Sequence, residues 1–243
     1  MRTSTYIERR FMTKRAVTLL SGGLDSVTTA FIAKNDIGKR GELYTLSFYY
    51  GQLHEKELEL AREISELLEV ENHTILDLPL NKLVFTALTG DEEIPVDSVD
   101  KQEGIPVTWV PQRNTLFLTL AAAYAETVDA DFIYIGVNAL DYSGYPDCRP
   151  EFIEAMNKTV NLASKRYIET GRGFSLEVPI IRKTKAEIIQ WGTELGVPYQ
   201  KTWSCYKGGD LACGRCDSCI LRLRGFSAAG LVDPIAYEEF SDE

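Results

Sequence analysis

Residues 16–26 have the sequence AVTLLSGGLDS, in which a run of apolar and β-branched residues leads directly into a polar turn with two adjacent glycines. The run at residues 16–20 has the length and composition of a buried strand, and the apolar spacing of residues 27–33 is typical of a helix. The glycine pair therefore lies at a strand-to-helix turn. Adjacent glycines let the backbone approach a ligand closely, and the unpaired N–H groups at a helix start attract anions. The segment thus predicts a phosphate-binding loop.

Two common nucleotide motifs do not fit this loop. It lacks the lysine of G-x-x-x-x-G-K-[ST], and its glycines do not have the G-x-G-x-x-G spacing. A polar turn with an aspartate cap is the alternative without a ligand. If the loop binds phosphates, Asp25 is expected to face the solvent and to hold a magnesium ion that the phosphates share. The predicted nucleotide contacts are Leu20, Ser21, Gly22, Gly23, Leu24, Asp25, Ser26, Val27 and Thr28.

The hexapeptide at residues 21–26 resembles the SGGxDS loop of the PP-loop ATP pyrophosphatases. This resemblance implies that the chain uses ATP, holds its β,γ-pyrophosphate and activates a substrate by transferring AMP to it. It also implies a parallel-sheet α/β fold of the adenine nucleotide alpha hydrolase type, which is Rossmann-like.

Length and composition indicate a soluble enzyme with a small-molecule substrate. The chain has 243 residues, 44% of them hydrophobic, which is enough for one α/β domain with an appendage. A formal net charge of −10 argues against broad nucleic-acid binding. The sequence has neither an apolar run long enough to cross a bilayer nor the apolar core of a secretory signal. We therefore expect a cytoplasmic protein with no nucleic-acid or membrane partner.

Four of the five cysteines lie close together near the C-terminus, with the spacing C-x7-C-x2-C-x2-C. Thiolates two residues apart can converge on one ion, and four sulfur ligands favour a structural zinc site over a catalytic one. A disulfide pair is the main alternative, but nothing in the sequence suggests an oxidising compartment. An iron–sulfur cluster uses the same ligands and is the other alternative. Nearby basic residues, Arg215 and Arg222 among them, favour zinc because they could offset the negative charge of the site. The predicted ligands are Cys205, Cys213, Cys216 and Cys219.

Between the glycine loop and the cysteines the chain alternates strand-like and helix-like segments, the pattern of a parallel sheet covered by helices. The later expectations include one helix over residues 150–167, strands at 131–137 and 176–180, and a mobile acidic loop at 90–100. Four parts are predicted: an N-terminal extension (1–14), an ATP-binding domain (15–200), a zinc knuckle (201–225) and a C-terminal tail (226–243).

Loops that follow the predicted strands carry further motifs. They are Tyr50-Gly51-Gln52 with His54, Val110-Pro111-Gln112-Arg113-Asn114, residues 144–149 (GYPDCR) and Lys183-Thr184-Lys185. Together with the cysteine knuckle, they resemble the 7-cyano-7-deazaguanine synthase family over nearly the whole chain. One departure is Gln112, where we expect the family to have glycine more often.

The family resemblance implies an ATP-dependent ligase. It would convert 7-carboxy-7-deazaguanine and ammonia to 7-cyano-7-deazaguanine through an adenylated acid and an amide, with Mg²⁺ and Zn²⁺ as further cofactors, in a homodimer. The implied catalytic residues are Asp25, Arg113, Lys183 and Lys185. The implied substrate contacts are Tyr50, Gln52, Asn114, Tyr145, Asp147 and Arg149, with Cys148 lining the pocket.

Three other functions are considered. A tRNA thiolase would need a basic surface, an ammonia-dependent synthetase of NAD or GMP gives no reason for the cysteines, and a zinc-bearing regulator leaves the ATP loop unexplained.

Overall fold

The computed structural model describes residues 13–52, 55–90, 93–99, 104–140 and 145–239. Most of the predicted N-terminal extension, His54 and Gly144, parts of the acidic loop and the last four residues lie outside these ranges.

The centre of the molecule is a five-stranded sheet in the order β3-β2-β1-β4-β5, and every neighbouring pair is parallel. The strands are β1 (Arg15–Leu19), β2 (Glu42–Tyr49), β3 (Asn72–Asp77), β4 (Phe132–Tyr134) and β5 (Ser175–Glu177). The central strand β1 is buried on both faces from Ala16 onward, which suits its mainly apolar and β-branched composition. The predicted fold class is confirmed. Strands β4 and β5 are shorter than the predicted segments.

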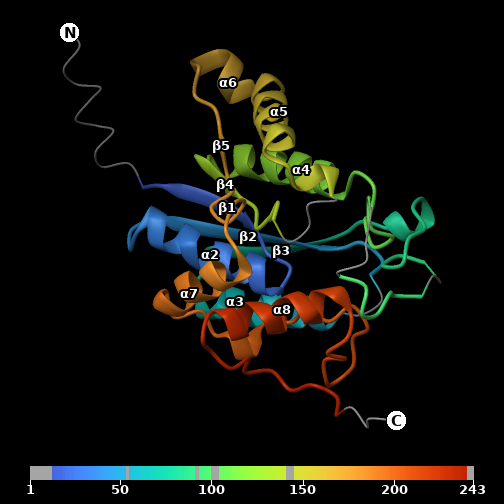
Figure 1. Ribbon diagram of the computed structural model, residues 1–243. Helices are drawn as coiled ribbons and strands as arrows, with labels where there is room; N and C mark the ends of the chain where they lie inside the picture. Colours follow the sequence, from blue (N-terminus) through green and yellow to red (C-terminus); the bar gives the residue numbers. More distant parts are fainter. Residues whose placement is uncertain (1–12, 53–54, 91–92, 100–103, 141–144, 240–243) are drawn as a thin grey trace.

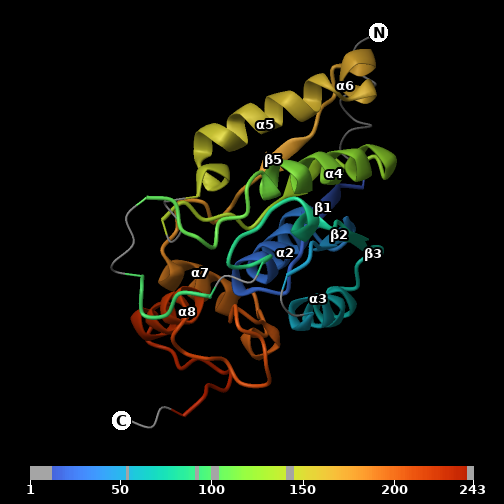
Figure 2. The ribbon, with the colours of Figure 1, turned by 90° about the vertical axis from the view of Figure 1, so that its right-hand side faces the viewer.

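Helices cover both faces of the sheet (Figures 1 and 2). On one face, α2 (Leu24–Ile37) and α3 (Lys56–Leu67) pack against the sheet, and beyond them α7 (Lys185–Glu194) packs against α2 and α8 (Asp217–Ala228) packs against α7. The other face packs against α4 (Arg113–Thr127), with α5 (Pro150–Leu162) and α6 (Lys165–Thr170) beyond it. Each face encloses its own apolar cluster. Short 3-10 turns lie at Leu80–Lys82, Pro146–Cys148 and Tyr199–Lys201. None of the helices in the described ranges is long and apolar enough to span a membrane.

The strand order reverses direction between β1 and β4. From β1 the chain moves outward to β2 and β3, and it then returns to the other side of β1 to form β4 and β5. In open parallel sheets the crevice for ligands lies at the carboxyl ends of the strands, at such a reversal. The glycine loop after β1 and residues 135–138 after β4 therefore flank the expected crevice.

The predicted helix over residues 150–167 is wrong, because the chain forms two helices there. Helix α5 ends at Leu162, and Ser164 then caps α6 by accepting a hydrogen bond from the N–H of Tyr167. The Asn161 side chain accepts from the N–H of Phe174 at 2.7 Å and so attaches the break to the segment before β5. Serine and asparagine favour such local bonds over a continuous helix.

The residue before α4 explains the departure at Gln112. Gln112 is the N-cap of α4 and has a left-handed backbone with φ of 61°. Glycine adopts this conformation without steric strain, whereas other residues adopt it rarely. A glycine preference at this position therefore follows from the backbone.

The acidic loop is expected from the sequence to be mobile, but its described residues 93–99 are bound to other parts of the chain. Val96 forms an antiparallel bridge with Cys216, and the N–H of Asp97 donates to the carbonyl of Arg215 at 2.9 Å. The Ser98 hydroxyl donates to the carboxylate of Asp217 at 2.7 Å. Residues 93–99 are therefore docked on the cysteine segment and on the start of α8.

Helix α8 links the cysteine segment to the C-terminal segment, and it crosses position 225, where the sequence predicts a domain boundary. The Arg222 guanidinium of α8 is 1% exposed and pairs with both oxygens of Asp233 at 2.7 and 2.9 Å. The same guanidinium donates to Thr202 and to the carbonyl of Tyr199, and Tyr237 donates to Asp233. Three segments of the chain thus meet at one buried ion pair.

We predict that Asp233→Ala lowers the free energy of unfolding by about 3–5 kcal/mol, because it leaves a buried guanidinium without its partner. Glu63→Ala is the control, since it removes an ion pair with Lys201 in which both side chains are nearly half exposed. This control should change stability by less than about 1 kcal/mol. Urea denaturation followed by circular dichroism measures both. Equal losses in the two variants would contradict the prediction.

Candidate active site and metal centre

A cavity of about 250 Å³ lies at the carboxyl ends of β1, β2 and β4. Its walls come from the glycine loop, the segment after β4, the start of α4 and the residues around Trp203. Most of the predicted site residues line it. These are Leu20, Ser21, Gly23, Leu24, Asp25, Ser26, Tyr50, Gln52, Arg113, Asn114, Tyr145 and Lys185. Cys148 lines it as well, as predicted.

The two serines of the glycine loop hold its shape. Their hydroxyl oxygens lie 3.0 Å apart, and the Ser26 hydroxyl donates to the carbonyl of Gly23 at 3.0 Å. The backbone N–H of Ser21 donates to the Ser26 hydroxyl at 3.1 Å. Helix α2 begins at Leu24, directly after Gly23, so the N–H groups of its first turn lie beside the cavity. This arrangement suits a multiply charged anion.

Gly22 is held between two parts of the chain. Its φ is 85°, and a Cβ atom at this position would lie 2.1 Å from the backbone carbonyl oxygen of Glu57 in α3. On its other side, the carbonyl of Gly22 accepts a hydrogen bond from the N–H of Trp203 at 3.0 Å. Only glycine fits here, for reasons of both conformation and space.

Asp25 does not face the solvent as the sequence analysis expects. Both of its carboxylate oxygens lie 2.8 Å from the Nζ of Lys185, at the start of α7. The side chains of Asp25 and Lys185 are 20% and 10% exposed. Gly225 of α8 makes room for the lysine, because a Cβ there would lie 2.2 Å from Cγ of Lys185. The two predicted catalytic residues therefore form a largely buried ion pair in the cavity wall.

Aromatic and basic side chains gather at the start of α4. The Arg113 guanidinium lies 5.7 Å from the centre of the Tyr50 ring, and Tyr50 also contacts the ring of Phe117. The Tyr145 hydroxyl lies 2.7 Å from that of Thr108. Burial raises the pKa of the Tyr50 hydroxyl, so this phenol is neutral at physiological pH. A guanidinium among flat rings can bind an anionic planar ligand.

Asp147, a predicted substrate contact, is not brought to the cavity wall. One of its carboxylate oxygens accepts from the backbone N–H of Asn114 at 3.1 Å, and the other accepts from the indole N–H of Trp109 at 3.3 Å. The Asn114 amide donates in turn to the carbonyl of Asp147 at 3.1 Å. The Asp147 carboxylate therefore positions the start of α4, and Asn114 with it.

Five other predicted residues also lie outside the cavity wall. Val27 is fully buried in an apolar cluster, and the Thr28 hydroxyl donates to the carbonyl of Leu24 at 2.8 Å. Lys183 lies over the ring of Trp191, 5.1 Å from its centre, and Arg149 is exposed. Gly22, the fifth, does not line the cavity and affects the site only through its packing against α3. The structure thus separates Lys183 from Lys185, although both flank the same helix cap.

Glu57 and Trp203 are among the further wall residues that the sequence analysis did not assign to the site. Burial raises the pKa of the Glu57 carboxyl to about 7. Glutamate in the first turn of a helix is common on surfaces, so its type and place gave no signal. Trp203 precedes the cysteine segment, and its indole N–H donates to the carbonyl of Cys205 at 3.0 Å. Its position two residues before the first cysteine was the only hint in the sequence.

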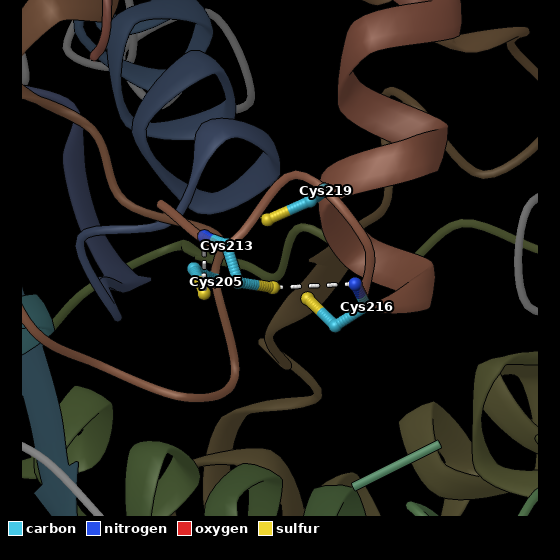
Figure 3. Close-up of side chains that lie close together, drawn as sticks. All are labelled: Cys205, Cys213, Cys216 and Cys219. Carbon is cyan, nitrogen blue, oxygen red and sulfur yellow. Dashed lines mark hydrogen bonds between the residues drawn. The ribbon is translucent and has the colours of Figure 1, made fainter. Parts of the chain in front are cut away.

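The four cysteines converge as predicted (Figure 3). All are buried, and their sulfur atoms lie within 4.8 Å of one another. Backbone N–H groups of Cys213 and Cys216 donate to the sulfurs of Cys205 and Cys213, each at 3.3 Å. N–H bonds of this kind stabilise thiolates. The cluster can hold one metal ion. Two of the basic neighbours, Arg215 and Arg222, pair with Asp97 and Asp233, which weakens the charge argument for zinc.

Comparison with known proteins gives a family for the whole arrangement. The model of the family described as queuosine biosynthesis protein QueC matches residues 15–230. The chain belongs to this family. Among its relatives are 7-cyano-7-deazaguanine synthases from Geobacter sp. (52% identical, covering 94% of this chain and 100% of the relative) and Thermoplasma acidophilum (49% identical, 93% of each). The matched region includes every predicted site residue.

Solved structures give weaker matches. A U34-tRNA thiolase from Methanococcus maripaludis, solved with its [4Fe-4S] cluster, is 15% identical with a TM-score of 0.48, and the match covers 82% of this chain and 62% of that one. An NMN synthetase from Francisella tularensis is also 15% identical, with a TM-score of 0.41, covering 86% and 71%.

We predict that Gly22→Ala displaces the glycine loop and weakens ATP binding more than tenfold, because the new methyl group meets the backbone of α3. Gly38→Ala is the matched control. Gly38 has a similar φ of 74° but nothing within 4 Å of an added Cβ. Both variants carry a conformational penalty of about 1 kcal/mol, whereas only the first also has a clash. Isothermal titration with ATP measures the difference, and unaltered ATP affinity in Gly22→Ala would refute the close packing.

Proposed function

We propose that this protein is a 7-cyano-7-deazaguanine synthase, which converts 7-carboxy-7-deazaguanine, ammonia and two ATP molecules to the nitrile. The observation that carries the proposal is that a PP-loop and a group of aromatic and basic side chains line one cavity. The names of the family's relatives agree with it. The proposal includes that the enzyme is a homodimer, lies in the cytoplasm and provides a precursor of modified nucleosides.

The glycine loop and the start of α2 would hold the pyrophosphate end of ATP. The substrate carboxylate attacks the α-phosphorus, a new P–O bond forms, and pyrophosphate leaves. The Arg113 guanidinium would attract the substrate carboxylate. The aromatic rings of Tyr50 and Tyr145 could stack on the deazaguanine, and a tyrosine hydroxyl could hydrogen-bond to it. Asn114, held by Asp147, presents its amide to the same space. The protein supplies position and charge stabilisation rather than covalent chemistry.

Two oxygens must leave the carboxylate, and each adenylation removes one. In the first pass ammonia adds to the acyl carbon, the C–O bond to AMP breaks, and a primary amide results. In the second pass the amide oxygen attacks a new ATP, two protons leave nitrogen, and loss of AMP gives the nitrile. One cavity can serve both passes because acid and amide share the deazaguanine ring.

The ion pair between Asp25 and Lys185 would rearrange when nucleotide binds. Magnesium neutralises charge on the phosphates and takes carboxylate oxygens as ligands. Asp25 would hold such an ion, and the metal would then compete with Lys185 for the same carboxylate oxygens. We infer that Lys185 turns from Asp25 to the phosphates when nucleotide binds, so that each charge gains an opposite partner. Lys183, which lies over Trp191, is a less direct anion contact.

The metal of the cysteine cluster is proposed to be zinc. Four sulfurs at about 2.3 Å from one ion lie about 3.8 Å from one another. The observed limit of 4.8 Å fits a single ion better than a cluster in which each sulfur binds a different iron. Zinc has no redox chemistry, and with four thiolate ligands it leaves no open position. Its role would be to fold residues 205–219.

The reaction products test the proposal. Purified protein with ATP, magnesium, ammonium and 7-carboxy-7-deazaguanine should release AMP and pyrophosphate and form the nitrile, detected by mass spectrometry. The synthetic amide should give the nitrile with ATP but without ammonium, because its nitrogen is already in place. Primary release of ADP would refute the site of attack. Failure of the amide under conditions in which the acid reacts would refute the shared cavity.

Elemental analysis tests the metal. Protein purified without added metal should contain about one zinc per chain, and Cys216→Ser should lose zinc and melt at a lower temperature. Cys148→Ser is the control, because Cys148 lies outside the cluster. It should keep full zinc content. A brown protein with iron and sulfide, or a fully stable Cys216→Ser variant, would contradict the assignment.

A further inference from the structure

Two carboxylates line the cavity in the described part of the chain, Asp25 and Glu57. Asp25 is engaged by Lys185. The Glu57 carboxylate, by contrast, has no hydrogen bond or ion pair with any described residue, although it lies at the start of α3 in the cavity wall. A carboxylate in a cavity wall without a partner among the described residues is available to a cation or a proton that belongs to a ligand.

Glu57 cannot move independently of the phosphate loop. Its backbone carbonyl packs against Gly22, and the neighbouring Lys56 lies 3.4 Å from the centre of the Trp203 ring. Lys56 also donates to the carbonyls of Gly209 and Asp210 at 2.8 and 3.0 Å. The start of α3 is thus held on two sides, so its second residue keeps a fixed relation to the loop.

The charges that face Glu57 come from two elements. Burial raises its pKa to about 7, the Arg113 guanidinium of α4 opposes this rise, and Cys205 of the knuckle adds to it. A carboxyl group with a pKa near the working pH exists in both forms, which suits repeated proton transfer.

The proposed reaction needs such a group. Ammonium is the main form of ammonia in water at neutral pH, and it has no lone pair with which to attack. It must lose one proton before the C–N bond forms and another afterwards. In the second pass, an N–H proton must leave nitrogen as the C–O bond to AMP breaks.

We propose that the Glu57 carboxylate binds ammonium in the cavity and is the general base of both passes. The inference rests on the proposed function and adds a residue to it. In the first pass Glu57 takes a proton from ammonium, the freed lone pair attacks the adenylated acyl carbon, AMP leaves with the electrons of the C–O bond, and the second proton passes to solvent. In the second pass one N–H proton passes to solvent after the amide oxygen is adenylated, and Glu57, having released its first proton to solvent, takes the remaining N–H proton as AMP leaves.

The test separates adenylation from the steps that need a base. Glu57→Gln keeps the size of the side chain and removes its basicity. Exchange of labelled pyrophosphate into ATP, dependent on the acid, reports adenylation alone. Product formation with ammonium reports the first proton transfer, and conversion of the amide to the nitrile reports the second. Glu59→Gln is the matched control, because Glu59 lies on the same helix and is exposed.

We expect Glu57→Gln to keep pyrophosphate exchange within about threefold of the wild type and to lose on the order of 100-fold in ammonium use and in nitrile formation from the amide at pH 7. The ammonium defect should shrink as pH rises, because free ammonia becomes abundant and needs no base to form it. Hydroxylamine, which is mostly neutral at pH 7, should form the hydroxamate in the variant at nearly the wild-type rate. Glu59→Gln should match the wild type in every assay.

Three outcomes would overturn the inference. Full ammonium use by Glu57→Gln would mean that no base is lost. Loss of pyrophosphate exchange in the variant would assign Glu57 to the binding of nucleotide, magnesium or acid instead. A defect that is the same at every pH and with hydroxylamine would indicate a structural role. Absence of exchange in the wild type is a separate result, since it refutes the proposed function itself.

Discussion

The close approach of Gly22 to α3 is the contact on which the site depends. An α-carbon without a side chain lets the loop after β1 lie directly against the carbonyl of Glu57, and the Trp203 N–H holds the loop from the other side. Without this packing, the N–H groups at the start of α2 would have no fixed direction. The loop is therefore positioned by contacts from distant parts of the chain rather than by its own turn alone.

The cysteine segment and α8 extend that dependence to the C-terminal part of the chain. Trp203 lies between the glycine loop and Cys205, and Arg222 fixes the segment before Trp203 through Thr202 and Tyr199. Gly225, on the same helix, makes room for Lys185. A metal held by the four cysteines would thus affect the nucleotide site through rigid backbone, without contacting the reacting groups.

The sequence was sufficient for the features that depend on local pattern. The parallel sheet, the strand-to-helix position of the glycine loop and the convergence of the four cysteines all follow from periodicity and spacing. Features that depend on pairing between distant residues were not predictable. The Asp25–Lys185 pair needs the packing of α7 against α2, and nothing near Asp147 indicates that its carboxylate would be taken up by α4. Glu57 was missed for the same reason, because a glutamate in a first helical turn is ordinary until its surroundings are known.

The bond between Gly22 and Trp203 also has a consequence for the order of synthesis. A ribosome adds roughly 5–20 residues per second, so on the order of ten seconds or more pass between the two residues. Throughout this interval the glycine loop lacks the hydrogen bond from Trp203 that holds it. One edge of β1 also stays open until β4 emerges, and an open strand edge is a template for wrong pairing. In a nascent chain the nucleotide site is therefore incomplete until the C-terminal part is made, and β1 remains open to pairing with other chains until β4 is made.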